Sequence, residues 1–138
     1  MLEINLQTSD GCQMVDITSD VQELVASRAI TTGSVLLFVP HTTAGITVNE
    51  NWDPDVQHDI LWALEQMVPH STVYRHSEGN SRAHIQALLT GDSLTIPIAK
   101  GRMRLGRWQG IFFCEYDGPR RRRVCVHVQT ASSPDAVD

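Results

Sequence analysis

The chain has 138 residues, of which 41% are apolar, and a formal net charge of -5 at pH 7. This length suits one ordinary domain with its own core, so residues 1–138 are expected to form a single domain. The first residues lack the basic and apolar segments of a secretion signal, and no stretch is apolar for long enough to cross a bilayer. We therefore expect a cytoplasmic protein with no membrane contact.

The charges are distributed unevenly along the chain. Arg28 is the only basic residue before position 70, where ten acidic residues lie. The later basic residues form a cationic segment that comprises Lys100, Arg102, Arg104, Arg107 and the run from Arg120 to Arg123. Such a segment can meet the phosphate groups of a small ligand, and a solvated arginine-rich hairpin is the alternative. Because the chain is acidic overall, with few aromatic residues near these arginines, no nucleic-acid partner is expected.

The cysteines do not form a recognisable motif. Cys12, Cys114 and Cys125 are odd in number and unrelated in spacing, and no Cys-x-x-Cys pair is present. We expect three reduced, buried thiols.

The first third of the chain predicts strands and one short helix. Residues 2–7 alternate between apolar and polar, and residues 14–17 are expected to pair with them as an opening hairpin. Ser19 and Gln22 resemble a capping box for a helix that ends before Gly33. Residues 34–39 form a continuous apolar run, which is typical of a strand covered on both faces.

The rest of the chain predicts helices and further strands. Asp53 is expected to cap a helix that begins at Pro54 and ends near Met67. A long loop over 69–80 and a short helix over 81–89 follow. Strands are expected over 93–98, 109–116 and 123–129. The fold class is therefore α+β, a single compact domain in which mixed or antiparallel sheets form a sandwich-like core with two principal helices.

Three of the six histidines are candidates for a metal site. His41 follows a strand, His76 lies in the long loop, and His84 lies on the next helix, so the fold could bring them together. Neutral imidazoles are common ligands of zinc and similar divalent metals. The remaining three, His58, His70 and His127, have contexts that favour structural roles.

Two polar segments are candidates for ligand binding. Gly79, Asn80 and Ser81 precede a predicted helix, whose first backbone amides could bind a phosphate; an ordinary capped helix is the alternative. Glu50, Asn51 and Asp53 concentrate carboxyl and amide groups in a turn, which turn chemistry explains only in part.

Three ordered blocks of sequence stand out. The first block spans His41 to Asn51 with Asp53-Pro54-Asp55-Val56, and the second spans His76 to Ile85. The third spans Gly101 to Ile111, followed by Glu115 and Gly118-Pro119-Arg120. Together these blocks resemble the YjbQ family, whose members are described as secondary thiamine-phosphate synthases. At Arg107 this chain departs from the threonine or serine that is common in the family, which bears on the shape and charge of the pocket.

The resemblance implies a compact homotrimer with its site near the subunit boundary. Glu78 and Glu115 would assist His41, His76 and His84, which could hold a divalent ion, zinc or magnesium. A small phosphorylated metabolite would contact a polar set that consists of Glu50, Asn51, Asp53, Gly79, Asn80, Ser81 and Arg120.

The implied activity joins hydroxymethylpyrimidine diphosphate to hydroxyethylthiazole phosphate and releases pyrophosphate, and the word secondary allows it to be a side reaction of the site. Such chemistry requires charge stabilisation and alignment of the two substrates. Two alternatives stay open, because a fold does not determine a function. One is a non-catalytic trimer that binds a phosphorylated metabolite or a metal, and the other is a different metal-assisted reaction on a phosphorylated substrate, such as hydrolysis.

Overall fold

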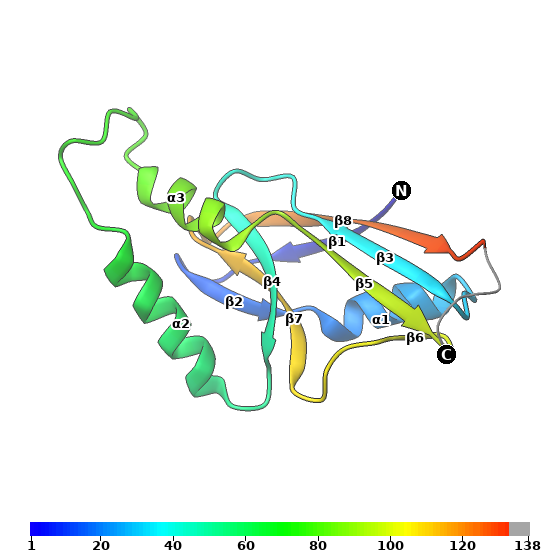
Figure 1. Ribbon diagram of the computed structural model, residues 1–138. Coiled ribbons are helices and arrows are strands. Elements are labelled where there is room, and N and C mark those ends of the chain that lie inside the picture. Colours follow the sequence, from blue (N-terminus) through cyan, green and yellow to red (C-terminus); the bar gives the residue numbers. More distant parts are fainter. Residues whose placement is uncertain (133–138) are drawn as a thin grey trace.

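Two antiparallel sheets and three helices make up the computed structural model, which describes residues 1–132 (Figure 1). The larger sheet has the strand order β1-β8-β3-β5-β6. Its strands are β1 (Leu2–Gln7), β3 (Gly33–Phe38), β5 (Ser93–Ala99), β6 (Arg102–Met103) and β8 (Arg121–Thr130). The smaller sheet has the order β2-β7-β4, with β2 (Gln13–Asp16), β4 (Ala44–Glu50) and β7 (Gln109–Glu115). The helices are α1 (Thr18–Ser27), α2 (Pro54–Met67) and α3 (Ser81–Thr90). The predicted α+β class is confirmed, with three helices rather than two principal ones.

The main core lies on the inner face of the larger sheet. Val35 and Leu37 of β3 are fully buried there, together with Val21 and Val25 of α1. Their neighbours on β3, Leu36 and Phe38, point away and are partly exposed. The prediction that this strand is covered on both faces is therefore wrong, because nothing within residues 1–132 covers the outer face of the larger sheet at β3.

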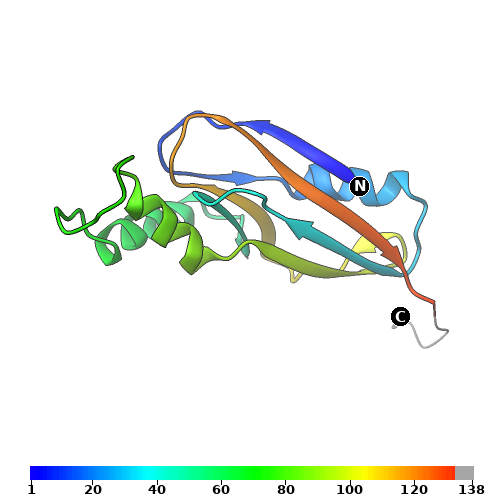
Figure 2. The same ribbon diagram turned by 90° about the horizontal axis from the view of Figure 1, so that it is seen from above.

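Strand β7 separates the two cores. Ile111 and Phe113 face the main core, whereas Phe112 and Cys114 face a smaller core beneath α2 and α3. Figure 2 shows these two helices, in green, gathered at one end of the molecule, with α1 at the other. Because the central strand is buried on both sides, it holds the two packing layers together.

The predicted opening hairpin does not form. β1 pairs with β8 in the larger sheet, and β2 pairs with β7 in the smaller sheet. The connection between β1 and β2 crosses from one sheet to the other, which local sequence signals cannot distinguish from a hairpin turn.

Of the two predicted helix caps, one is confirmed and the other is wrong. The Asp53 side chain accepts a hydrogen bond from the Asp55 amide at 2.9 Å, and Pro54 is the first residue of α2, as predicted. The capping box at Ser19 and Gln22 is wrong, since α1 begins at Thr18. Gln22 instead contacts the β5–β6 turn, where its side chain donates to the Gly101 carbonyl and accepts from the Met103 amide.

Leu37 and Leu36 offer a matched test of the core. Leu37 has no exposed side-chain surface, whereas Leu36 is 41% exposed. Leu37→Ala should lower the free energy of unfolding by about 2–5 kcal/mol, because it leaves a cavity. Leu36→Ala should cost less than about 1 kcal/mol. Urea denaturation measures both, and equal losses would contradict this placement of the core.

Candidate active site

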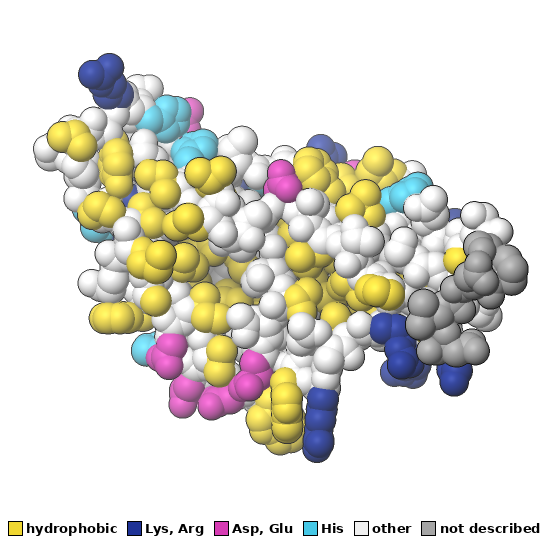
Figure 3. Space-filling model, in the orientation of Figure 1, with side chains coloured by type: hydrophobic (Ala, Val, Ile, Leu, Met, Phe, Trp, Pro, Cys, Tyr) yellow, Lys and Arg dark blue, Asp and Glu magenta, His cyan; other side chains and the backbone are white. Residues whose placement is uncertain are grey.

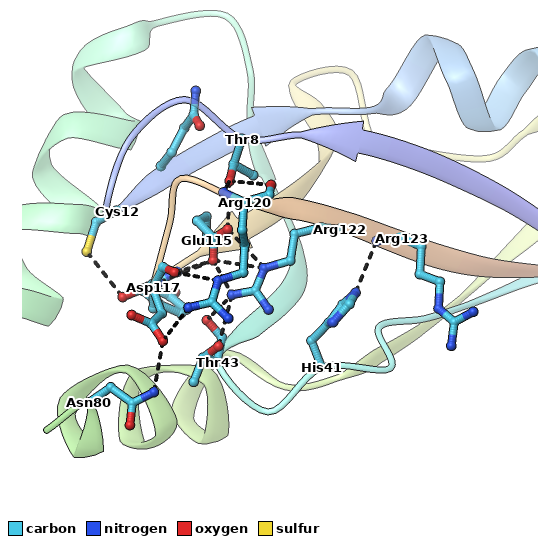
Figure 4. Close-up of polar contacts among 12 residues, drawn as sticks. Thr8, Cys12, His41, Thr43, Asn80, Glu115, Asp117, Arg120, Arg122 and Arg123 are labelled. Atoms are coloured by element: carbon cyan, nitrogen blue, oxygen red, sulfur yellow. Dashed lines mark hydrogen bonds and ion pairs between the residues drawn. The ribbon is translucent and has the colours of Figure 1, made fainter. Parts of the chain in front are cut away.

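A buried ion pair stands where the two sheets meet at the α3 end of the molecule (Figure 4). The guanidinium of Arg122 on β8 donates from Nε to both carboxylate oxygens of Glu115 on β7, at 2.9 and 3.1 Å, and its Nη2 donates to the same carboxylate. Nη2 also donates to the Thr43 hydroxyl at 2.9 Å. The Thr8 hydroxyl donates to Glu115 at 2.7 Å. Both charged side chains are buried. The network joins β7, β8, the residue after β1 and the segment before β4.

These bonds determine the protonation state of Glu115. Burial alone would raise the pKa of this carboxyl, but the hydrogen bonds from Arg122 and Thr8 outweigh burial and hold the pKa below its ordinary value. The amides of Tyr116 and Asp117 add two more donors to the same carboxylate. Glu115, which the resemblance placed among the catalytic residues, therefore has its oxygens engaged in holding the fold.

Arg122 was not among the predicted site residues, although the sequence carries a signal for it. Val124 and Val126 face the core, and a strand alternates with a period of two. The same alternation places Arg122 inside and leaves Arg121 and Arg123 exposed.

A second polar group lies at the turn between β7 and β8. Arg120 donates to the Asp117 carbonyl at 2.8 Å and to its carboxylate at 2.9 Å. The same carboxylate accepts from the Asn80 amide at 2.8 Å, which connects the turn to the start of α3. A side chain on Gly118 would approach the Asp10 carbonyl to 2.3 Å, so glycine is required in this turn. Arg120 is thus partly neutralised by Asp117.

His41 is held in one tautomer by the backbone of β8. Its Nε2 accepts a hydrogen bond from the Arg123 amide at 3.0 Å, so the proton of the neutral ring lies on Nδ1. Burial and the nearby Arg122 guanidinium lower the pKa of His41. A neutral ring with an occupied Nε2 and a protonated Nδ1 is a hydrogen-bond donor in this geometry, not a metal ligand.

His76 and His84 do come together, as the resemblance implied. Their ring centroids are 5.3 Å apart with an interplanar angle of 87°, an edge-to-face contact. A Glu78 carboxylate oxygen lies 4.0 Å from His76 Nε2, a distance too long for a direct hydrogen bond. The two rings line a shallow pocket of about 360 Å³ together with Tyr74, Arg75, Ser81 and Ile85. We call it the histidine pocket.

The loop that carries His76 also borders a second pocket, of about 570 Å³. Tyr74, Gly79 and Arg82 line it, with Gly79 at a positive φ of 74° that favours glycine. Arg82 donates to the carbonyls of Val68 and Glu65 at the end of α2. This arginine therefore joins α2 to α3.

The predicted polar segment of Glu50, Asn51 and Asp53 lies at and beyond the end of β4 that is far from the ion pair. Glu115 pairs with Ala44, next to Thr43, whereas Glu50 pairs with Gln109 six residues further along β4. Six residues of strand span about 20 Å, so Glu50 and the histidine pocket are well separated in one chain. Asp53 is used as the cap of α2, and the Asn51 amide donates to Asp16 at 3.1 Å.

Trp52, Arg107 and Trp108 form a surface cluster beside this segment, which we call the aromatic tip. Trp52, which is 77% exposed, contacts Trp108 at 5.8 Å between ring centroids, and the Arg107 guanidinium lies 4.9 Å from the Trp108 ring centre. Figure 3 shows apolar, basic and acidic side chains close together along the lower edge of the molecule. Arg107 therefore lies in this aromatic tip, not in the histidine pocket.

The structure does not group the three histidines that the sequence offered as metal ligands. Across residues 1–132, no group of three or more His, Cys, Asp or Glu side chains is placed to hold a metal ion. His76 and His84 share a pocket, but His41 is not among the residues that line it.

The cysteine expectation is confirmed in part. All three thiols are free, but only Cys114 is buried, while Cys125 is half-buried and Cys12 is exposed. None of the helices within the described part of the chain has the length and apolarity needed to span a membrane.

Fold and site together define a small α+β protein in which two antiparallel sheets support an end rich in arginine and histidine. The sequence profile of the UPF0047 protein YjbQ-like family matches residues 2–131. The chain therefore belongs to the YjbQ (UPF0047) family.

Relatives and solved structures agree with this membership. The UPF0047 protein MJ1081 of Methanocaldococcus jannaschii is 44% identical over 128 residues, which cover 93% of each chain. The UPF0047 protein YugU of Bacillus subtilis is 44% identical over 124 residues, or 89% of this chain and 94% of its own. A crystal structure of a YjbQ/UPF0047 family protein from Clostridium acetobutylicum superposes with a TM-score of 0.91 at 49% identity, covering 94% of this chain and all of the other.

The comparisons overturn the expected activity. A structure from Sulfolobus solfataricus, with a TM-score of 0.89 and 32% identity over 94% of this chain and 95% of its own, is described as a YbjQ-like protein of unknown function. The relatives carry only UPF0047 names, with no synthase activity attached. Neither thiamine-phosphate synthesis nor the alternative of a non-catalytic trimeric binding protein finds support, so membership of this family assigns no reaction.

The Glu115–Arg122 pair predicts acid sensitivity. Because the folded-state pKa of Glu115 lies below its unfolded value, its stabilisation is complete above about pH 4.5 and is lost as the pH falls towards the folded pKa. Glu115→Gln should flatten the fall in the free energy of unfolding between about pH 5 and pH 3. At pH 7 it should cost about 3–5 kcal/mol, since Arg122 is left buried without a counter-charge.

Glu3 provides the control for this test. It pairs with Arg123 at 3.3 Å on the surface, so Glu3→Gln should cost at most about 1 kcal/mol. Urea denaturation across this pH range measures both variants. An unchanged pH slope in Glu115→Gln, or equal costs for the two variants, would contradict the assignment.

Proposed function

We propose that the protein is an acid–base enzyme that hydrolyses an ester bond in a small organic anion, with its catalytic groups in the histidine pocket. The observation that carries the proposal is the contact between His76 and His84 in one open pocket. Imidazole is the side chain best suited to exchange protons near neutral pH, and two imidazoles can divide the roles of base and acid.

The edge-to-face contact limits where a substrate can bind. The two rings touch, so the substrate lies beside them and not between them. One neutral imidazole takes a proton from the attacking water, and the other, protonated, gives a proton to the leaving oxygen. The Glu78 carboxylate lies near this pair, with one oxygen 4.0 Å from His76 Nε2.

The anionic part of the substrate is supported by the cationic and amide groups around the pocket. Arg75 and Ser81 both line it, and Ser81 is the first residue of α3. The amides of Ala83 and His84 bond to the Asn80 carbonyl, which leaves those of Ser81 and Arg82 available to a ligand. A helix start of this kind favours negative charge.

Replacement of either histidine tests the proposal. Purified protein is assayed against a panel of aryl phosphate and aryl carboxylate esters. His84→Ala and His76→Ala should each lower kcat/KM by about 10²- to 10⁴-fold, the usual contribution of a general acid or base. His58→Gln, on the exposed surface of α2, is the matched control and should stay within about twofold. No hydrolysis above a heat-denatured control, or full activity in His84→Ala, would rule out this function.

We also propose that the protein associates as a homotrimer, as its resemblance to the family implied. Large apolar side chains on the surface support association, with Trp52, Trp62, Met67 and Leu88 all more than half exposed. The cytoplasmic location stays a prediction from the sequence.

Light scattering after gel filtration tests the assembly. The expected mass is about three times the chain mass of 15.4 kDa. A mass that equals one chain at every concentration would contradict the trimer.

A further inference from the structure

Helix α2 rests on the smaller sheet without being packed tightly into it. The structure describes the whole of this helix, and none of its fourteen residues is buried. Its C-terminal end is tied to α3, because Arg82 donates to two carbonyls of the last turn and Gln86 donates to that of Leu64. Leu61 and Leu64 pack against the smaller core, and a space remains beside them between the helix and the sheet.

This space is a partly open cavity of about 200 Å³. Its floor comes from the smaller sheet, and its walls come from α2 and from the end of α3. The lining residues are Met14, Thr47, Asn49, Ile60, Leu64, Leu89, Thr90, Cys114 and Tyr116. A volume of this size is enough for a single ring, since an apolar cavity of about 150 Å³ binds benzene.

The polar groups of the cavity have defined hydrogen-bonding roles. The Thr90 hydroxyl donates to the Gln86 carbonyl at 2.9 Å, so in its contact with Tyr116 the phenol is the donor. The phenolic oxygen of Tyr116 therefore keeps its lone pairs for a ligand. At the rim, Asn49 Oδ1 accepts from the Glu50 amide, while its Nδ2 group has no acceptor within the described part of the chain.

The cavity cannot neutralise a charged ligand, because no charged side chain is among the described residues that line it. Burial raises the pKa of the Cys114 thiol to about 12 and also raises that of Tyr116, so both groups stay neutral near pH 7. A charged ligand would lose its hydration there without a partner.

We propose that this cavity, beneath α2, binds a neutral single-ring molecule that carries one hydroxyl or amide-like group. The ring fills the space between Ile60, Leu64 and Met14, and its polar group donates to Tyr116 and accepts from Asn49. This site is separate from the histidine pocket, because the two lie at opposite ends of α3: Ser81 and His84 line one, and Leu89 and Thr90 line the other.

Phenol is the probe, and benzoate is the charged ring used for comparison. The uniformly ¹⁵N-labelled full-length protein is titrated with each, and amide shifts are followed by NMR. Phenol should shift the amides of Thr47, Leu89 and Cys114, and benzoate should bind at least about tenfold more weakly. Shifts confined to other parts of the molecule, or equal binding of the two rings, would overturn the proposal.

Three variants make the test specific. Thr47→Leu fills the cavity and should weaken phenol binding at least about tenfold, whereas Thr95→Leu, on an exposed position of β5, should leave it within about twofold. If Thr47→Leu fails to fold, Asn49→Asp, at the exposed rim, replaces the amide donor by an acceptor and should weaken binding about fivefold or more. Unchanged affinity in the folded cavity variants would overturn the proposal.

Discussion

The ion pair between Glu115 and Arg122 is the constraint on which the rest of the structure depends. It joins a strand of the smaller sheet to a strand of the larger one, and its neighbours Thr8 and Thr43 connect two further segments to the same point. A buried pair of this kind contributes little net stability compared with apolar packing, but losing one partner is costly. Its structural effect is to fix how the two sheets meet, and therefore where the β7–β8 turn and α3 lie.

The histidine pocket depends on that arrangement. The turn after Glu115 presents Asp117 to Asn80, and Asn80 precedes the helix that carries His84. The same pair keeps a guanidinium beside His41, which adds to the effect of burial in lowering the pKa of that histidine. One buried salt bridge thus orients the elements around the candidate catalytic groups without contacting a substrate. Remote polar groups commonly support catalytic side chains in this way.

The α3 helix connects the two sites proposed for this chain. Its first turn borders the histidine pocket, and its last turn closes the cavity beneath α2. Arg82 on the same helix holds the end of α2, so the three features share one rigid element. The aromatic tip around Trp108 lies at the far end of β4 and takes no part in either site within one chain.

The sequence by itself determined the class of fold, the family, the cap of α2 at Asp53 and the neighbourhood of His76 and His84, because these depend on local patterns and short separations. It could not pair β1 with β8, since strand partners are chosen by packing across more than a hundred residues. For the same reason, the sequence could not show that His41 lies outside the pocket that His76 and His84 share. Alternation along β8 could have indicated that Arg122 is buried, but its partner Glu115 lies on a different sheet. Only the tertiary structure, which sets strand register and sheet order, decided which polar residues hold the fold together and which remain free to act on a ligand.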